Sequence, residues 1–210
     1  TGSGKSTLVN LIPRFFDVTE GRILVDGVDI RQMPLHELRE RIGYVPQKGV
    51  LFSGTIDSNI RYGKEAATEA EVQRAAEIAQ AWDFIEEKED GVQSAIAQGG
   101  TNVSGGQKQR LSIARAIAKN PEIYIFDDSF SALDYKTDVV LRRALKKETK
   151  DATTLIVAQR ISTILHADKI LVLDEGHVVG QGTHKELLKS CDVYRQIAMS
   201  QLSEEELADE

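Results

Sequence analysis

The chain has 210 residues, of which 41% are hydrophobic and 28% are charged, and its formal net charge is −7. A chain of this length can bury a substantial core as one large domain or two small ones, and its ordinary composition excludes collagen, coiled coil and intrinsic disorder. The single cysteine, Cys191, excludes an internal disulfide framework, and without a Cys/His cluster a structural zinc site is not expected. No apolar run approaches the roughly 18 residues that span a bilayer. The negative charge disfavours a nucleic-acid partner, since such a partner usually requires a basic face.

The chain opens on a glycine-rich segment, Thr1-Gly-Ser-Gly-Lys-Ser-Thr7. Gly4, Lys5 and Ser6 match the end of the phosphate-loop pattern G-x-x-x-x-G-K-S/T, whose first glycine would precede residue 1. We therefore expect this sequence to be a piece of a longer chain, with the strand that feeds the loop lying upstream. The backbone N–H groups of such a loop converge on phosphate oxygens, Lys5 would reach the β- and γ-phosphates, and Ser6 would bind Mg²⁺. Taken alone, the truncated motif is also compatible with a chance surface turn.

Apolar spacing predicts the elements that follow this segment. Segment 6–16 has apolar residues at helical intervals, which predicts a helix. Short apolar runs predict strands at 21–27, where the strand ends in a turn, and at 42–45. Between these strands, segment 34–40 is predicted to be a helix with a proline in its first turn.

The remainder of the chain divides into a helical and a strand-rich part. Segment 55–120 is dominated by Ala, Glu, Gln and Arg, which predicts a helical subdomain. The apolar runs at 123–126, 154–157 and 170–173 are typical of strands buried on both faces. Strands that alternate with helices in this way indicate a parallel sheet covered on both sides, and the acidic segment from Ser203 onward is predicted to be a frayed tail.

Asp127 directly follows the apolar run at 123–126. The carboxyl ends of parallel strands open on the crevice where such sheets bind ligands. Beside a phosphate loop, a carboxylate in this position would hold Mg²⁺, directly or through water. A solvated aspartate at a strand end is the alternative, and the phosphate loop in the same chain makes that alternative weak.

A second glycine turn, Val103-Ser-Gly-Gly-Gln107, opens a strongly helical segment that runs to Lys119. The start of a helix attracts anions through its N–H groups and its dipole, so this turn is a second candidate phosphate site. Two such sites in one domain suggest that each serves a different nucleotide, or one shared across a dimer. An ordinary glycine-rich helix start, capped by Ser104, is the structural alternative.

Several segments together resemble the nucleotide-binding domain of ABC transporters, in the order that this family has. The matching segments are Tyr44-Val-Pro-Gln47, residues 51–60, the Ser-Gly-Gly-Gln block at 104–107, the strand ending in Asp127, Ser-Ala-Leu-Asp at 131–134, and residues 182–188. The segment at 51–60 is similar to one typical of exporter-type members. The resemblance covers the chain from Thr1 to about Leu188.

This resemblance implies an α/β fold with a RecA-like P-loop NTPase core, an inserted all-helical signature subdomain, and N-terminal strands that are missing from this fragment. The first part of the core is expected at 1–54 and the helical subdomain at 55–120. The second part of the core is expected at 121–190, and a C-terminal helix with the acidic tail at 191–210. In this family two such domains pack head to tail, and each ATP lies between the phosphate loop of one domain and the signature turn of the other. In this chain the signature turn is the Ser-Gly-Gly-Gln block at 104–107.

Carried over residue by residue, the resemblance implies ATP and Mg²⁺ as cofactors and assigns the site residues. The residues expected to bind ATP are Gly2, Ser3, Gly4, Lys5, Ser6, Thr7 and Gln47. The residues expected to bind Mg²⁺ are Ser6, Gln47 and Asp127. The residues expected to contact the γ-phosphate of the ATP bound by the partner domain are Ser104, Gly105, Gly106 and Gln107, and Asp134 is expected in the loop that links the two sites. The aromatic residue that stacks on adenine is expected before Thr1.

The sequence departs from the family at two positions that serve hydrolysis. Asp128 stands where the family has a glutamate that polarises the attacking water, and Gln159 stands where it has a histidine. The shorter side chain withdraws the carboxylate by about 1.5 Å, which is one C–C bond, and a general base must lie within about 2.6–3.2 Å of its proton or act through one water. Gln159 can donate a hydrogen bond to a phosphate oxygen but cannot carry a proton or a positive charge.

The signature turn at 104–107 is intact, whereas Asp128 and Gln159 differ from the residues that the family has. We therefore hypothesise that this chain is the degenerate-site half of a heterodimeric exporter. Its partners would be a second nucleotide-binding domain with the glutamate and the histidine, and the transmembrane domains of the same transporter. It would lie on the cytoplasmic face of a membrane and bind no nucleic acid. The alternatives are a soluble ABC-type ATPase that acts on nucleic acid or the ribosome, and a non-hydrolysing regulatory ATP-binding subunit.

The histidines show no spacing typical of metal ligands. We expect all of them to be surface residues, namely His36, His166, His177 and His184. Cys191 is expected to be a structural or an exposed thiol.

Overall fold

The computed structural model describes residues 2–203, so Thr1 and nearly all of the predicted acidic tail lie outside the described residues. The chain forms two compact units. The central unit is Asp17–Leu155, and the terminal unit combines Thr1–Phe16 with Ile156–Glu210. This division cuts across the predicted domain boundaries, which remain a proposal. Each unit is described by itself.

A three-stranded sheet has the strand order β3-β6-β7, and the central unit contains it as far as Leu155 in β7. Strand β3 (Ile42–Val45) runs parallel to β6 (Ile123–Asp127), with Ile42 opposite Ile123 and Val45 opposite Phe126. Both strands were expected, and β6 is buried from Tyr124 to its end, as its continuous apolar run predicts.

Strand β7 (Thr153–Val157) also forms as expected, but the prediction that it is buried on both faces is wrong. It lies at the edge of the described sheet and exposes Thr153 and Thr154, while only Val157 is buried. The two exposed residues are threonines, whose hydroxyls can bond to water, so the polar start of this segment is not forced into the core.

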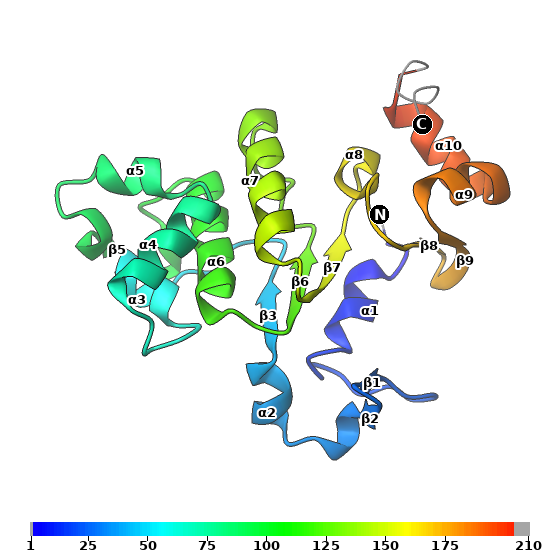
Figure 1. Ribbon diagram of the computed structural model, residues 1–210, viewed down its shortest axis with the longest axis horizontal. Helices are drawn as coiled ribbons and strands as arrows, with labels where there is room; N and C mark the ends of the chain where they lie inside the picture. Colours follow the sequence, from blue (N-terminus) through cyan, green and yellow to red (C-terminus); the bar gives the residue numbers. More distant parts are fainter. Residues whose placement is uncertain (1, 204–210) are drawn as a thin grey trace. The chain divides into compact units, whose positions relative to one another are not determined.

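Helices gather on one side of β3 and β6, at the left of Figure 1. They are α3 (Ile56–Arg61), α4 (Glu69–Ile78), α5 (Trp82–Glu86) and α6 (Gly105–Lys119). A short antiparallel pair, β4 (Gly54–Thr55) with β5 (Ala95–Ile96), and three-residue 3₁₀ turns at Gly91–Gln93 and Gln98–Gly100 complete this region. Capping boxes start three of these helices, at Thr55, Thr68 and Ser104.

Helix α6 is the centre of this helical group. Leu111, Ile113 and Ala114 are completely buried on it, and α3 and α4 pack against it. A helix that is apolar on so much of its circumference must be surrounded by other elements. Helix α6 therefore holds the group together and also packs against β3 of the sheet.

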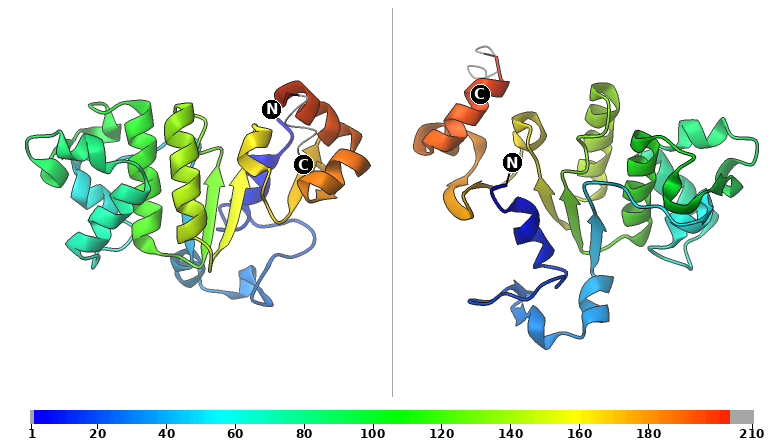
Figure 2. Two further views of the ribbon diagram at one scale, coloured as in Figure 1. Left: turned by 45° about the horizontal axis from the view of Figure 1, so that its top comes forward. Right: turned by 180° about the vertical axis from the view of Figure 1, so that it is seen from behind.

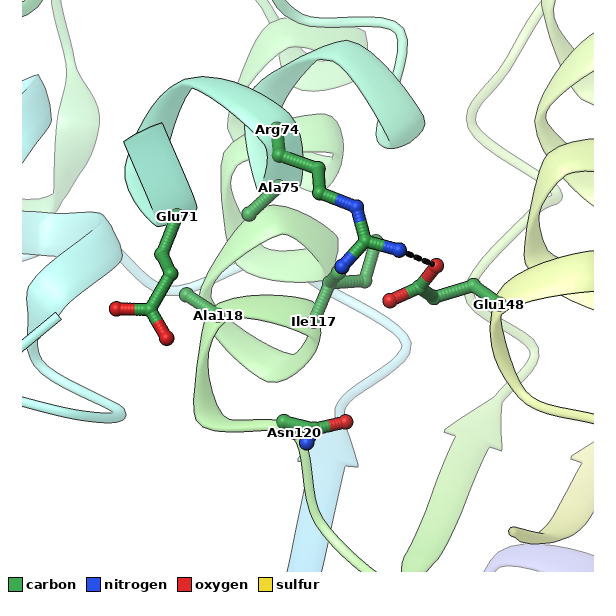
Figure 3. Close-up of a pocket in the computed structure, with 7 residues that line it drawn as sticks. All are labelled: Glu71, Arg74, Ala75, Ile117, Ala118, Asn120 and Glu148. Carbon is green, nitrogen blue, oxygen red and sulfur yellow. Dashed lines mark hydrogen bonds and ion pairs between the residues drawn. The ribbon is translucent and has the colours of Figure 1, made fainter. Parts of the chain in front are cut away.

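Helix α7 (Tyr135–Glu148) follows β6 in the chain (Figure 2). It buries Leu141 and Leu145. Near its C-terminus, Glu148 accepts a hydrogen bond from Arg74 of α4 at 2.6 Å, and this ion pair borders a small pocket (Figure 3). The pocket is lined by Glu71, Arg74, Ala75, Ile117, Ala118, Asn120 and Glu148. None of these residues belongs to the predicted nucleotide site.

The N-terminal part of the central unit contains less regular structure than expected. The strand predicted at 21–27 is only β1 (Leu24–Val25), which pairs with β2 (Val28–Asp29) across a turn at Asp26 and Gly27. Both turn residues have positive φ, as a tight two-residue hairpin requires. A 3₁₀ turn at Ile30–Gln32 follows, and then α2 (Leu35–Glu40), with Pro34 as its N-cap.

In the terminal unit, the helix predicted over 6–16 ends early. Helix α1 is Lys5–Asn10, and the chain continues in turns. Pro13 lacks an N–H and disfavours helical backbone at the residue before it, while Arg14 has a φ of 54°. Apolar spacing alone therefore overestimated the length of this helix.

The terminal unit continues with α8 (Ile161–Ile164), β8 (Ile170–Asp174), β9 (His177–Gly182), α9 (His184–Ser190) and α10 (Asp192–Gln201). The prediction that the run at 170–173 is a doubly buried strand of a parallel sheet is wrong. Strand β8 pairs antiparallel with β9, and Leu171 is 48% exposed. The turn residues Glu175 and Gly176 both have positive φ and reverse the chain at once, which a parallel connection does not allow.

His184 was expected at the surface, but it is only 2% exposed. Its Nδ1 lies 2.7 Å from the Tyr194 hydroxyl, in a core that also contains Leu187 and Cys191. His184 and Leu187 lie three residues apart and so share one face of α9, so periodicity could have indicated a buried histidine. Cys191 is a buried thiol.

Candidate functional site

The glycine-rich segment forms a tight loop before α1. Gly2 and Gly4 have φ angles of 83° and 90°, a region that favours glycine. The Lys5 ammonium donates a hydrogen bond to the Ser3 hydroxyl at 3.0 Å and so lies over the loop. Helix α1 has only six residues, so the loop backbone and the Lys5 charge, rather than a long helix dipole, are what this segment offers to an anion.

The loop is attached to the β8–β9 hairpin of the same unit. The Gly176 N–H donates to the Ser3 carbonyl oxygen at 3.2 Å, and a Cβ on Gly4 would lie 3.8 Å from the Gly176 Cα. Ser6 and Thr7 follow on the first turn of α1 and are exposed.

In the central unit, the parallel pairing of β3 and β6 brings three predicted site residues together. Gln47 follows β3, whereas Asp127 ends β6 and Asp128 comes next. The Gln47 Nε2 donates to the Asp128 Oδ2 at 3.2 Å. Residues that lie about 80 positions apart in the chain thus meet at the carboxyl edge of the sheet, as the strand predictions imply.

Asp127 is largely buried, with 5% exposure, and the Tyr44 hydroxyl donates to its Oδ2 at 3.3 Å. Burial and the neighbouring Asp127 charge raise the pKa of Tyr44 to about 12, so the phenol keeps its proton at neutral pH. The Ser129 hydroxyl donates to the Val45 carbonyl oxygen at 2.8 Å and ties the end of β6 to the end of β3. The two strand ends therefore form a connected polar edge.

Asp128 has a φ of 49°, in the left-handed region. Aspartate is one of the few residues other than glycine that adopts this conformation readily. The Ser131 hydroxyl donates to its carbonyl oxygen at 3.0 Å and helps to hold the turn. The backbone conformation thus favours a short polar side chain at this position.

The signature turn forms the N-terminus of α6. The Ser104 hydroxyl accepts from the Gln107 N–H, and the Gln107 side chain accepts from the Ser104 N–H, both at 3.1 Å. Ser104 and Gly105 are exposed, and nothing lies within 4 Å of a Cβ placed on Gly105. Ser104 thus caps the helix, as the structural alternative expects. The same turn also places Gly105, which has no side chain, at the surface.

The loop before α7 lies next to the signature turn. A Cβ on Gly106 would be 3.6 Å from the Ala132 carbonyl oxygen. Asp134 caps α7 by accepting hydrogen bonds from the Thr137 hydroxyl and N–H, which lower the pKa of Asp134. The fold thus places the segment at 131–134 beside the signature turn, although the two are separated in sequence.

Gln159 is exposed in a loop of the terminal unit, between β7 and α8. A second glutamine, Gln201 at the end of α10, holds this loop. Its Nε2 donates to the Gln159 carbonyl oxygen and its Oε1 accepts from the Ile161 N–H, both at 2.8 Å. Sequence reasoning missed Gln201, because nothing in the local pattern distinguishes it from a polar residue at a helix end.

Lys5, Ser6 and Gln159 belong to the terminal unit, and Gln47, Asp127 and Asp128 to the central unit. Carboxylate, amide and hydroxyl oxygens are the ligands that Mg²⁺ prefers, so the donor types predicted for the metal fit that ion. Between residues 2 and 203 there is no cluster of three or more His, Cys, Asp and Glu side chains that could hold a metal by itself. Within the same range, no helix combines the length and the apolar composition that a bilayer span requires.

Comparison with known proteins agrees with this geometry. The family model described as ABC transporter matches residues 1–131. An uncharacterized ABC transporter ATP-binding protein of Mycobacterium bovis is 50% identical over 204 residues, which is 96% of this chain and 35% of that protein. A putative multidrug export ATP-binding/permease protein of Staphylococcus aureus is 49% identical over 197 residues, which is 94% of this chain and 34% of that protein. The chain thus spans about a third of the length of these relatives.

A solved structure, that of a bacterial Atm1-family ABC exporter with ATP bound, matches with a TM-score of 0.92 and 42% identity. The match covers 97% of this chain and 36% of the exporter chain. The match confirms the predicted α/β class of a P-loop NTPase core. The chain therefore belongs to the ABC transporter family of ATPases and is an ATP-binding domain of the exporter type.

Proposed function

We propose that this chain is the motor domain of an ABC exporter, in which binding and hydrolysis of ATP at a head-to-tail interface between two such domains drive substrate across a membrane. The observation that carries the proposal is the meeting of Gln47, Asp127 and Asp128 where β3 and β6 end. A glutamine and two carboxylates on adjacent parallel strands form an edge suited to a nucleotide–metal complex.

The nucleotide would be held by the loop at Gly2–Thr7, with Lys5 neutralising the β- and γ-phosphates. Gln47 would contribute to the same site. Bound Mg²⁺ would neutralise charge that develops on the phosphate oxygens during transfer. Ser6, Gln47 and Asp127 would hold that ion, and the Tyr44 hydroxyl bonded to Asp127 would orient the carboxylate.

The signature turn would act on a nucleotide bound by the partner domain. Ser104, Gly105, Gly106 and Gln107 would contact that γ-phosphate. The exposed Ser104 and Gly105 at the start of a 15-residue helix support this role, because N–H groups and a helix dipole both point toward an approaching anion. Asp134 would relay changes between the two sites, and its loop already lies against Gly106.

At this chain's own ATP site, hydrolysis would be weak. The Asp128 carboxylate is one methylene shorter than a glutamate and is bonded to the Gln47 amide, which draws it toward the glutamine. Gln159 cannot carry the charge of a protonated histidine. The chain would then be the degenerate half of a heterodimer whose partner supplies the glutamate and the histidine, with transmembrane domains of the same transporter at the cytoplasmic face of the membrane. Nucleic acid is not a partner in this proposal.

The test is site-resolved trapping of labelled nucleotide in the intact transporter. Asp128→Glu combined with Gln159→His should raise turnover at this chain's site by about 10²-fold or more, the effect of a well-placed general base. Asp128→Asn is the matched control and should lower this already slow turnover little.

A site that already turns over as fast as the partner site would refute the degenerate-half proposal. The substitutions at Asp128 and Gln159 also favour a second candidate, a non-hydrolysing regulatory ATP-binding subunit. This candidate predicts that the doubly substituted variant traps no nucleotide at this chain's phosphate loop, even when a complementary chain is added.

A further inference from the structure

The loop that carries Gln47 is held by another glutamine, Gln109, from the second turn of α6. The Gln109 Oε1 accepts from the Gly49 N–H at 2.7 Å, and its Nε2 donates to the Pro46 carbonyl oxygen at 3.0 Å. Gln109 is only 1% exposed. One buried amide therefore pairs with a backbone group on each side of Gln47.

The loop also lies directly on the helix backbone. A Cβ on Gly49 would come within 2.8 Å of both the Lys108 carbonyl oxygen and the Ser112 hydroxyl. Real Cβ atoms do not approach other atoms so closely, so only glycine permits this contact. The loop thus has no room to shift toward α6, and the bonds of Gln109 prevent it from moving away.

The exposed Gln47 side chain extends from this loop to the Asp128 carboxylate. The loop backbone is held at Pro46 and Gly49, so the distance that the Gln47 side chain reaches toward the carboxyl edge of the sheet depends on the position of α6. Helix α6 begins at the Ser104 turn, five residues before Gln109, which is about 7.5 Å along a helix axis. A rigid helix therefore connects the signature turn to the Gln47 loop.

We propose that Gln109 is a positioning residue, which holds Gln47 in place for Mg²⁺ and makes the position of Gln47 follow that of the signature turn. The inference rests on the metal role proposed above for Gln47. Gln109 does not touch the ion. It acts by pairing with two partly buried backbone groups, and such groups are costly to leave unpaired where water does not reach them.

The test measures how Mg²⁺ affects binding of a fluorescent ATP analogue to the intact protein. Gln109→Met keeps the size of the side chain and removes both hydrogen bonds. We expect the half-saturating Mg²⁺ concentration to rise about ten-fold, as is typical when a group that orients a metal ligand is lost. Affinity for the analogue in the presence of a chelator should not change, whereas a merely structural defect would also weaken binding of the analogue without Mg²⁺.

Gln73→Met, on the exposed face of α4, is the matched control and should leave both values unchanged. If Gln109→Met does not fold, Gln109→Asn serves instead. It keeps the amide but is one methylene shorter, so it cannot make both hydrogen bonds at their full strength, and it should shift Mg²⁺ dependence in the same direction by a smaller factor.

Gln47→Ala and the double variant separate the two proposals. If Gln47→Ala leaves Mg²⁺ dependence unchanged, the metal role of Gln47 is wrong, and the positioning role falls with it. If Gln47→Ala shifts Mg²⁺ dependence and Gln109→Met adds nothing in that background, Gln109 acts through Gln47. If Gln109→Met produces its full shift in the Gln47→Ala background, or none in the wild type, the positioning role is overturned while the metal role stands.

Discussion

Two loops that carry predicted site residues, one in each unit, are each held by two hydrogen bonds from a glutamine side chain, but the two glutamines differ in their exposure to solvent. In the central unit the Gln109 amide holds the Gln47 loop, with bonds of 2.7 and 3.0 Å. In the terminal unit the Gln201 amide holds the Gln159 loop, with bonds of 2.8 Å each. The bond lengths are alike, but Gln109 is buried within α6, whereas Gln201 is the exposed last residue of α10.

The comparison teaches that hydrogen-bond geometry alone does not set how firmly a loop is held. Water can replace the partners of Gln201, so breaking its bonds costs little. Water cannot reach Gln109 without opening the packing of α6, so its bonds open only with a larger rearrangement. We therefore expect the Gln47 loop to be rigid and the Gln159 loop to open readily.

The largest expected effect is that of Gln109→Met on the Gln47 loop. Two backbone groups lose their partner, at a cost of about 1–3 kcal/mol each. Amide hydrogen exchange of the Gly49 N–H should become at least about 30-fold faster, since the two losses together cost about 2 kcal/mol or more and about 1.4 kcal/mol corresponds to a factor of ten.

Gln201→Met is the matched change in the terminal unit, and it should speed exchange of the Ile161 N–H by no more than about five-fold, which is about 1 kcal/mol. Equal acceleration at both sites would show that burial does not distinguish the two loops. Exchange at each site should be unaffected by the variant in the other unit.

A smaller loss of stability is expected from Gly49→Ala. The new methyl group would meet the Lys108 carbonyl oxygen and the Ser112 hydroxyl at 2.8 Å, and overpacking of this kind costs about 1–3 kcal/mol. Thermal unfolding should shift down by several degrees. Gly105→Ala, where a Cβ meets nothing within 4 Å, is the control for this stability measurement and should not lower the midpoint. Equal midpoints for the two variants would contradict the close seating of the Gln47 loop.

The smallest effect concerns alkaline pH at the base of the Gln47 loop. The folded-state pKa of Tyr44 is raised to about 12 by burial and by Asp127, against about 10 in the unfolded chain. A neutral phenol is thus favoured in the folded state, so this contribution to stability is complete below pH 10 and is lost as pH rises toward 12.

Urea unfolding of Tyr44→Phe between pH 8 and 11 measures this contribution. The variant should show a shallower decline above pH 10 than the wild type. Part of the decline should remain, because burial also raises the pKa of Tyr124 to about 12. Identical slopes in the two proteins would contradict the assignment to Tyr44.

Sequence reasoning predicted best where a local pattern and its tertiary surroundings agree. The apolar run of β6 and the helix that Ser104 caps both form as expected, because each carries its own start, stop and burial signals. It was wrong where one pattern fits two environments. The apolar runs of β8 and β6 have the same sequence pattern. A two-residue turn at Glu175 and Gly176 follows β8, however, so β8 forms an antiparallel hairpin with β9.

For the site, the sequence by itself determined the residue types and their order: the glycine loop with Lys5, the strand-end carboxylates and the capped signature turn. Only the tertiary structure decided which side chains hold them, such as Gln109 and Gln201, and that His184 is buried. The reason is physical. Glycine loops, caps and strand ends are encoded by neighbours in the chain, whereas an amide that pairs with a distant backbone is chosen by packing, which brings together residues 60 positions apart.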